Sequence, residues 1–587
     1  MYRFSGQLPK IGIRVIVDGR RNGVREKIEG PTFELANNVK SLIENNLRHP
    51  SGEKVEAIIS STSIGGVFEA AKVSQEFKEQ NVGAIISISK AWAYASEVIE
   101  MDKELPQAIW GFNGSERPGA VFLAGAIAAS EQKGLPIFKI YGRDVQDATD
   151  NSVPDDVAKQ ILHFAKCAIA VATMKGKAYL SMGGTCMGIG GSIVIPELFQ
   201  DYFGMRNEYV DMTEFVRRIE QEIYDKEEYE RALKWTKEHC KECADPNPKE
   251  IQQSREKKDK VWEFCVKAAL IAKDLMCGND KLKEIDRIEE SCGHYAIAGG
   301  FQGQRQGTDH FPNTDFMESI LNSCFDWNGV REPYIIATEN DSLNAMSMLM
   351  GHLVTGQSQM FADVRTYWSP TAIKRVCGRD NLPSSLEDGF IYLTNSGAAA
   401  LEGCGLAGIK PFYEMTDEDV DNCLKATTWG AGKLATFRGG GFSASFETKG
   451  GLPLTATRLN YIKGLGPALQ IAEGYTIELE DDIKRTLVAR TDPTWPKTFF
   501  SPRLTGKGAF KDTYTVMKKW GANHASLCFG HIGDKLITLA SMLRIPVYMH
   551  NVEEDRIIRP AAWDAFGTEN YEAADFSACK NFGPLYR

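Results

Sequence analysis

Two carboxylates stand where this chain could carry out acid–base or metal chemistry. Glu339 follows the apolar segment 333–338 and precedes a helical pattern over 345–354. It is therefore expected at the end of a strand in an αβ unit, where such folds bind ligands. Asp363 stands inside an apolar and aromatic run, and a buried carboxylate is costly unless it is paired or binds a metal. On residue type alone, pairing of Asp363 with an arginine such as Arg365 is the favoured interpretation.

Histidine is scarce in the chain, and two of its nine histidines, His524 and His531, lie close together. Taken singly, such a histidine is more often structural than a ligand. Glu339, Asp363 and His524 together would form an oxygen-rich site suited to manganese, magnesium or cobalt. Such a site leaves open positions for two neighbouring substrate oxygens. Spacing alone does not join the three residues.

Other motifs carry weaker signals. The glycine clusters at 183–191 and 503–508 match neither a dinucleotide fingerprint nor a phosphate loop, so close backbone packing or sugar contact is the favoured interpretation. Cys240 and Cys243 form a lone C-x-x-C pair after His239, at the end of a charged helical pattern, and a structural role is favoured for them.

Composition and charge narrow the class of partner. The 587 residues include 68 Lys and Arg against 78 Asp and Glu, with a pI near 5.6 and no basic block. This argues against nucleic-acid or anionic-membrane binding and favours a small-molecule partner. The 13 cysteines lack a disulfide-framework spacing, no signal-peptide pattern opens the chain, and no apolar run reaches the roughly 18 residues of a membrane span. We therefore expect a cytoplasmic protein.

The candidate residues need a scaffold, and the periodicity of the chain predicts one in three parts. Strand and helix patterns alternate up to residue 141, with strands expected at 10–17, 56–60, 82–88 and 135–141 and helices at 33–47, 66–77 and 118–133. A second αβ series opens at 177–182 and includes two amphipathic helices between 217 and 273. From about 355 the chain becomes rich in Gly, Thr and aromatic residues, for example at 390–394 and 442–446.

The predicted fold class is α/β, with two αβ domains containing mostly parallel sheets and a C-terminal antiparallel β-rich domain. The expected domains are 1–174, 175–354 with Glu339, and 355–587 with Asp363 and His524.

Long segments in the same order resemble the L-fucose isomerase family, which includes enzymes acting on D-arabinose. The segments that carry the resemblance are 10–14, 18–21, 109–119, 300–305, 325–329, those around Glu339 and Asp363, 437–441, 462–466, 503–508 and 520–524.

The resemblance implies a three-domain subunit in a manganese-dependent homohexamer with active sites between subunits. It implies that Glu339 and Asp363 are metal-binding acid/base residues and that His524 is the third metal ligand. It also implies substrate-contacting residues: Gln302, Trp92 lent by a neighbouring subunit, and, from similar pocket segments, Arg14, Phe442, Trp495 and Asn523.

The chain departs from the family pattern around the expected sugar pocket. Alanines at 91, 93 and 95 flank Trp92 where the family has Cys, Cys and Gly, and Gly307 replaces a tryptophan. The implied function is metal-dependent conversion of L-fucose to L-fuculose, and of D-arabinose to D-ribulose, through a cis-enediol. Two acids beside a metal favour this route over a hydride shift. The alternatives are an isomerase that prefers D-arabinose or another aldose, or a metal-dependent sugar aldolase or dehydratase.

Overall fold

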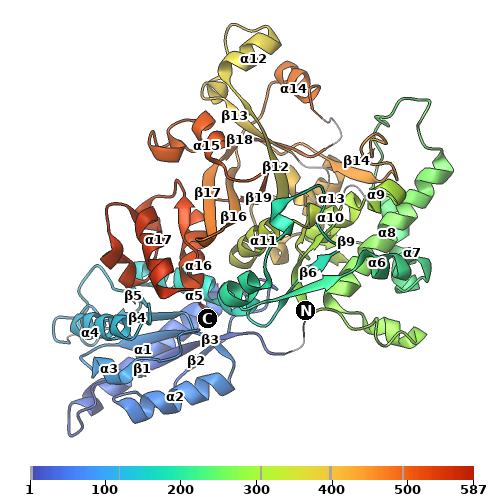
Figure 1. Cartoon of the computed structure of the whole chain (residues 1–587). Helices are drawn as coiled ribbons and strands as arrows, with labels where there is room; N and C mark the ends of the chain where they lie inside the picture. Colours follow the sequence, from blue (N-terminus) through green and yellow to red (C-terminus); the bar gives the residue numbers. More distant parts are fainter. Residues whose placement is uncertain (1–3, 5, 118, 304–306, 395–398, 492–494) are drawn as a thin grey trace.

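The computed structural model describes the whole chain except residues 1–3, 5, 118, 304–306, 395–398 and 492–494. It has the predicted α/β class, with two parallel sheets followed by an antiparallel one (Figure 1).

The first sheet is entirely parallel and has the order 2-1-3-4-5. Its strands are β2 (Ala57–Ile59), β1 (Lys10–Ile16), β3 (Val82–Ser89), β4 (Gln107–Gly111) and β5 (Phe138–Ile140). The helices of this unit are α1 (Arg25–Asn46), α2 (Val67–Glu79), α3 (Ala95–Val98), α4 (Gly119–Gln132) and α5 (Asp155–Met174). Strand order reverses between β1 and β3, so their carboxyl ends flank the crevice in which such sheets bind ligands.

The second sheet is also parallel, in the order β11-β8-β6-β7. Its strands are β6 (Ala178–Met182), β7 (Arg206–Val210), β8 (Ala296–Phe301) and β11 (Ile336–Ala337). Around it lie α6 (Met212–Glu220), α7 (Lys226–His239), α8 (Arg255–Cys277), α9 (Gly307–His310), α10 (Asp315–Asn322) and α11 (Ser342–Thr355), with a short ribbon of β9 (Phe325–Asp326) and β10 (Gly329–Val330). The two amphipathic helices predicted in this region are α7 and α8.

The C-terminal sheet closes on itself. Six strands pair around a ring, because β16 pairs with both β19 and β17. In ring order they are β16 (Pro453–Ile462), β19 (His524–Phe529), β12 (Met360–Trp368), β13 (Phe390–Thr394), β18 (Lys497–Pro502) and β17 (Gly466–Thr476), and β20 (Val547–Met549) adds to β17. A separate ribbon contains β14 (Thr428–Ala431) and β15 (Phe442–Ser445). The helices are α12 (Pro370–Cys377), α13 (Asp417–Ala426), α14 (Asp481–Val488), α15 (Thr513–Lys519), α16 (Gly533–Leu543) and α17 (Tyr571–Phe582).

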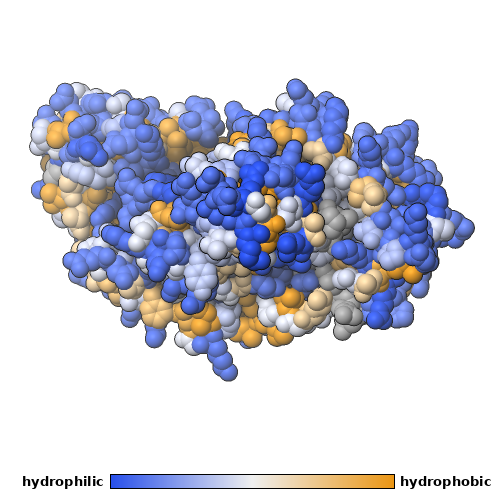
Figure 2. Space-filling model, turned by 90° about the horizontal axis from the view of Figure 1, so that it is seen from above, coloured by the Kyte–Doolittle hydropathy of each residue, from blue (hydrophilic) through white to orange (hydrophobic). Residues whose placement is uncertain are grey.

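One of the buried hydrophobic clusters contains residues from all three parts. Residues of α5, α11 and α16 belong to the same buried cluster as one face of the first sheet. The C-terminal helices α16 and α17 lie beside the first unit, with α16 packed on α5 (Figure 1). Among the described residues, α5 is the one helix long and apolar enough to cross a membrane, and 61% of that apolar window is buried inside the fold. Seen from above, the surface is mainly hydrophilic, with hydrophobic residues in small patches (Figure 2).

Candidate active site

The barrel places Asp363 and His524 opposite each other. Asp363 on β12 pairs with His524, the first residue of β19, so both side chains extend from the same face of the sheet. Asp363 Oδ1 lies 3.5 Å from His524 Nε2. The His524 ring packs against Phe361, with 4.5 Å between ring centroids. Two residues far apart in sequence therefore become neighbours through one strand pairing.

Glu339 reaches the same nitrogen from the second parallel sheet. Its Oε2 atom lies 3.4 Å from His524 Nε2. The predicted strand before it, 333–338, is shortened at both ends to β11 (Ile336–Ala337). Ile335 before β11, and Glu339 and Asn340 after it, adopt left-handed backbone angles, with φ of 49°, 58° and 54°. Non-glycine residues in this region cost roughly 1–3 kcal/mol each and concentrate at functional sites. This turn directs Glu339 across the seam between sheet and barrel.

Neighbouring strand ends support the turn. Asn340 Oδ1 accepts a hydrogen bond from Tyr179 Oη at 2.8 Å, and Asn340 Nδ2 donates to Ser181 Oγ at 2.6 Å. A Cβ at Gly300 would lie 2.3 Å from Tyr179 Oη and 2.5 Å from Asn340 Oδ1, so only glycine fits there. The turn that carries Glu339 is therefore held in place, through Asn340, by residues of β6 and β8.

Asp341, on the other side of the histidine, was not singled out from the sequence. Its Oδ2 atom lies 2.6 Å from His524 Nδ1 and 2.6 Å from Arg458 Nη1 on β16. Burial alone would raise the pKa of Asp341, but Arg458 and His524 lower it well below the usual range. In the sequence, Asp341 has the position of an ordinary N-cap residue of a helix. It does cap α11, because its side chain accepts a hydrogen bond from the backbone N–H of Asn344.

The charges of the cluster shift the pKa values of His524 and Asp363. Burial lowers the pKa of His524, but hydrogen bonds to Asp341 and Glu339 and the charges of Asp341 and Asp363 raise it to about 9. Burial and the nearby Glu339 charge raise the pKa of Asp363 to about 6, against the opposing effect of His524 and Arg365. The Asp363 side chain keeps 33% exposure, and Arg365 lies 3.7 Å from its Oδ2 atom. The predicted pairing with an arginine thus exists alongside the contact with His524.

Three predicted substrate-contacting residues lie at or beside this cluster. Asn523 Nδ2 lies 3.0 Å from His524 Nε2. Gln302 follows β8, and its Oε1 atom accepts a hydrogen bond from the backbone N–H of Gly184 at 2.9 Å. The next residue, Gly303, lies against the backbone of Glu339. The Trp495 ring lies 5.5 Å from the Arg365 guanidinium.

The remaining predicted residues lie elsewhere in the single chain. Phe442 is fully buried and stacks on Trp262, with 4.0 Å between centroids. Arg14 on β1 is buried, its Nε and Nη2 atoms lack a hydrogen-bond partner among the described residues, and burial lowers its pKa to about 10. Trp92, which follows β3, packs against the hydrophobic cluster of the first unit, beside Gly125 of α4.

His531 and Gly307 were also singled out from the sequence, and the structure describes the surroundings of His531 alone. His531 lies with its Nε2 atom 2.9 Å from the carbonyl oxygen of Gly474 and contacts the Tyr475 ring edge to face. Residues 304–306 lie outside the described part of the chain, as does the side-chain environment of Gly307.

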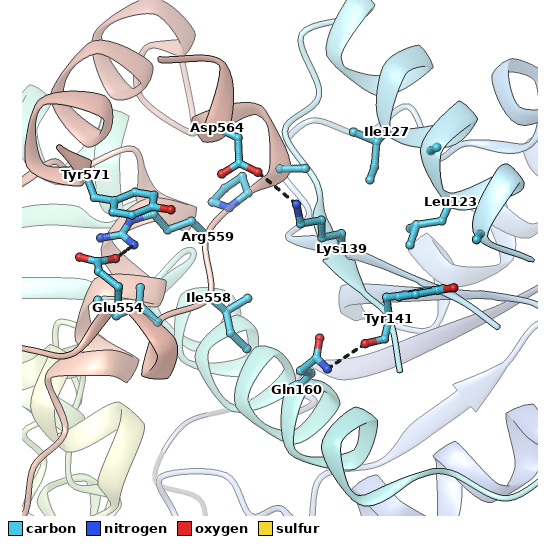
Figure 3. A pocket seen from close by; sticks show the side chains of 15 residues that line it. Leu123, Ile127, Lys139, Tyr141, Gln160, Glu554, Ile558, Arg559, Asp564 and Tyr571 are labelled. Carbon is cyan, nitrogen blue, oxygen red and sulfur yellow. Dashed lines mark hydrogen bonds and ion pairs between the residues drawn. The ribbon is translucent and has the colours of Figure 1, made fainter. Parts of the chain in front are cut away.

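None of the residues of this cluster lines a cavity of about 750 Å³ elsewhere in the molecule (Figure 3). It lies between α4, α5 and the segment 554–571, and its charged groups are paired: Lys139 with Asp564 at 3.1 Å and Arg559 with Glu554 at 2.6 Å. We therefore take the cluster at His524 as the candidate active site, because acidic and basic groups from two structural units meet there.

Comparison with known proteins decides the family. Family models match three consecutive segments: L-fucose isomerase, first N-terminal domain, at 8–176; second N-terminal domain, at 177–356; and C-terminal domain, at 393–550. The chain belongs to the L-fucose isomerase family. Proteins named L-fucose isomerase from Streptococcus pneumoniae (strain Hungary19A-6) and Bacteroides thetaiotaomicron are each 55% identical to it, over 99% of this chain and 100% and 99% of theirs. The resemblance stated from the sequence is confirmed, and the chain is a sugar isomerase of the L-fucose isomerase type.

Proposed function

We propose that this chain interconverts L-fucose and L-fuculose, and D-arabinose and D-ribulose, with a divalent cation, preferably Mn²⁺, at Glu339, Asp363 and His524. The observation that carries the proposal is the approach of two carboxylates, from different structural units, to one imidazole nitrogen at 3.4 and 3.5 Å. The L-fucose isomerase relatives support the choice of sugar.

The donor set fits such a cation. Among the described residues, no group of three or more His, Cys, Asp or Glu side chains has the closed geometry of a preformed metal site. The distances of 3.4 and 3.5 Å from His524 Nε2 to Glu339 and Asp363 nevertheless favour a cation site. Ligand atoms about 2.1 Å from one cation are themselves roughly 3.0–3.4 Å apart. With a pKa of about 9, His524 is protonated at neutral pH and lies as a cation between the carboxylates. Release of its Nε2 proton would free that position for the metal.

The residues of the chain account for the proton transfers. A bound cation would act as a Lewis acid for the two oxygens that exchange carbonyl and hydroxyl character. One carboxylate removes the C2 proton while the other acid, in its protonated form, donates a proton to O1, which gives the cis-enediol. The same carboxylate returns a proton to C1 while the other removes the O2 hydroxyl proton. Glu339 and Asp363 together therefore account for every proton transfer in the reaction.

We further propose that the chain forms a homohexamer in which Trp92 of the first unit contributes to the active site of a neighbouring copy. Trp92 follows β3 at the topological switch point of a 2-1-3-4-5 sheet, where ligands bind in such folds. Phe68 at 82% and Val121 at 56% exposure are large hydrophobic residues on the surface of the same unit, and a contact between copies would remove them from water. We also keep the prediction of a cytoplasmic location.

A ketose assay tests the proposal. The metal-stripped chain is incubated with L-fucose or D-arabinose, with and without Mn²⁺, and the product is identified by mass and by its ketose reaction. We expect a ketose of unchanged mass only with the cation. His524→Ala should abolish the restoration, whereas His531→Ala, the matched control seven residues away, should retain most of it. Full activity of the stripped chain would refute metal dependence.

A further inference from the structure

The buried carboxylate of Asp341 contacts the ring nitrogen of His524 that does not contact Glu339 or Asp363. Its Oδ2 atom is 2.6 Å from Nδ1, whereas both other carboxylates approach Nε2. Arg458 Nη1 donates to the same Oδ2 atom at 2.6 Å. Asp341 is 0% exposed and Arg458 is 3% exposed, so the ion pair is formed out of water.

Two further contacts fix the position of Asp341. Its side chain caps α11 by accepting the backbone N–H of Asn344 at 3.2 Å. The glycine-rich loop passes directly over it: a Cβ at Gly191 would lie 1.9 Å from Asp341 Oδ1. The carbonyl oxygen of Gly191 accepts a hydrogen bond from Ser342 Oγ at 2.7 Å, which holds the loop against the start of the helix. This contact accounts for the end of the glycine cluster at 183–191.

We propose that Asp341, held by Arg458 and the Gly191 loop, is a positioning residue that fixes the orientation and tautomer of His524 for metal binding. A carboxylate only accepts hydrogen bonds, so Nδ1 must carry its proton, and the lone pair of the neutral ring is then on Nε2. Nε2 is the atom that faces Glu339 and Asp363. The inference rests on the proposed function, because it assigns Asp341 a role toward the cation proposed there.

The substitution Asp341→Asn removes the negative charge of the side chain but keeps its size and shape, so it tests whether the charge positions His524. Arg458 and His524 Nδ1 contact the same Oδ2 atom, so an asparagine oxygen in that place can still accept both hydrogen bonds, but without the negative charge. Its amide N–H₂ group then replaces Oδ1 and faces the backbone N–H of Asn344, so that two donors meet. The asparagine therefore holds the Nδ1 proton less strongly than the carboxylate does. Gly191→Ala is the complementary change, because it displaces the carboxylate by steric contact and leaves its charge in place.

Titration calorimetry with Mn²⁺ tests the inference without turnover. Loss of such an outer contact typically weakens metal binding roughly 10–100-fold. We expect a Kd increase of this size for Asp341→Asn and for Gly191→Ala. The matched control is Glu332→Gln, which alters a second carboxylate–histidine pair, at His352, with 3.2 Å between Glu332 Oε1 and His352 Nε2. It should leave the Mn²⁺ affinity unchanged.

The outcomes distinguish this inference from the proposed function. A wild-type chain that binds no Mn²⁺ contradicts the proposed function and this inference together. If the wild type binds Mn²⁺ and both folded variants bind it within twofold of wild type, only the inference is overturned. A crystal structure of the wild type with Mn²⁺ decides the case if the variants do not fold. His524 should bind the cation through Nε2 with Nδ1 against Asp341, and a ring turned the other way would overturn the inference.

Discussion

At the residue scale, the site consists of a histidine surrounded by carboxylates. Glu339 and Asp363 lie near Nε2 of His524 and Asp341 lies at Nδ1. Glu339, Asp363 and His524 were predicted as site residues from the sequence, through strand-end position, the expected burial of a carboxylate and family resemblance, and the fold brings them together. Asp341 was not, because its partner Arg458 is 117 residues away and only the fold brings them together.

The two candidate bases should be individually indispensable. Glu339→Gln and Asp363→Asn retain shape but remove a base and a charged ligand, so kcat should fall by about a hundredfold or more in each. Because both act in one cluster, the double variant should lose less than the product of the single effects. Steady-state kinetics at saturating Mn²⁺ measures this. Near-normal turnover of either single variant would remove that residue from the mechanism.

Metal binding should release a proton at neutral pH. The folded-state pKa of His524 is raised to about 9 from an ordinary value of 6.5, so its proton must leave Nε2 as a cation binds. Mn²⁺ affinity should therefore rise by roughly tenfold per pH unit from about pH 7 and level off above pH 9. Calorimetry in buffers of different ionisation enthalpy should show about one proton released at pH 7. A pH-independent affinity across this range would contradict the assignment.

The same shift has a consequence for the metal-free fold. A raised pKa stabilises the folded state fully below pH 6.5, and this contribution is lost as pH rises toward 9. The melting temperature of the stripped chain should thus fall over pH 6.5–9, and the fall should be smaller in His524→Gln. Equal slopes in both proteins would show that His524 does not cause the effect.

At the element scale, strand ends and one strand pairing assemble the site. Periodicity predicted the parallel strands and the two helices α7 and α8, because buried strands and amphipathic helices repeat locally. It predicted a helix from residue 33, whereas α1 begins at Arg25, because Gly30 and Pro31 interrupt the pattern. It also overextended the strand before Glu339. Left-handed residues there are imposed by contacts from β6 and β8, which no local pattern contains.

Gly300 tests this supporting role of β8. Gly300→Ala places a methyl group against Tyr179 and Asn340, so the left-handed turn should shift and kcat should fall at least tenfold. Gly184→Ala is the matched control at the same sheet edge, since a Cβ there meets nothing within 4 Å. Kinetics and thermal melting of both variants measure the effect. Equal activity of the two variants would contradict the role of β8 in holding the turn.

At the scale of the whole molecule, the residues proposed for the pocket belong to different parts of the chain. Trp92 belongs to the first unit, whereas the proposed metal ligands lie where the second sheet meets the barrel. If Trp92 completes the site of a neighbour, Trp92→Ala should raise KM and lower kcat with Mn²⁺ affinity nearly unchanged.

Mixing tests the shared site directly. Oligomers reassembled from Trp92→Ala and Glu339→Gln chains should regain activity, because some interfaces then combine an intact Trp92 with an intact Glu339. Oligomers of either variant alone are the controls and should stay impaired. No gain on mixing would place Trp92 outside the neighbour's site.

Substrate preference belongs to the same scale. Gly307→Trp introduces the tryptophan that the family resemblance leads us to expect at a position near the far end of the sugar. L-fucose differs from D-arabinose by the C5 methyl group. A methyl contact is worth about 1–3 kcal/mol, so the ratio of kcat/KM for the two sugars should shift roughly tenfold. An unchanged ratio would exclude this position from selectivity.

The most direct test of the central claim is an anomalous difference map from crystals of the wild-type chain soaked in Mn²⁺, recorded at the manganese edge. The account predicts one strong peak per chain, within about 2.0–2.3 Å of Glu339, Asp363 and His524 Nε2. A peak coordinated by other residues, or no peak at this cluster in a chain that isomerises L-fucose, would contradict it.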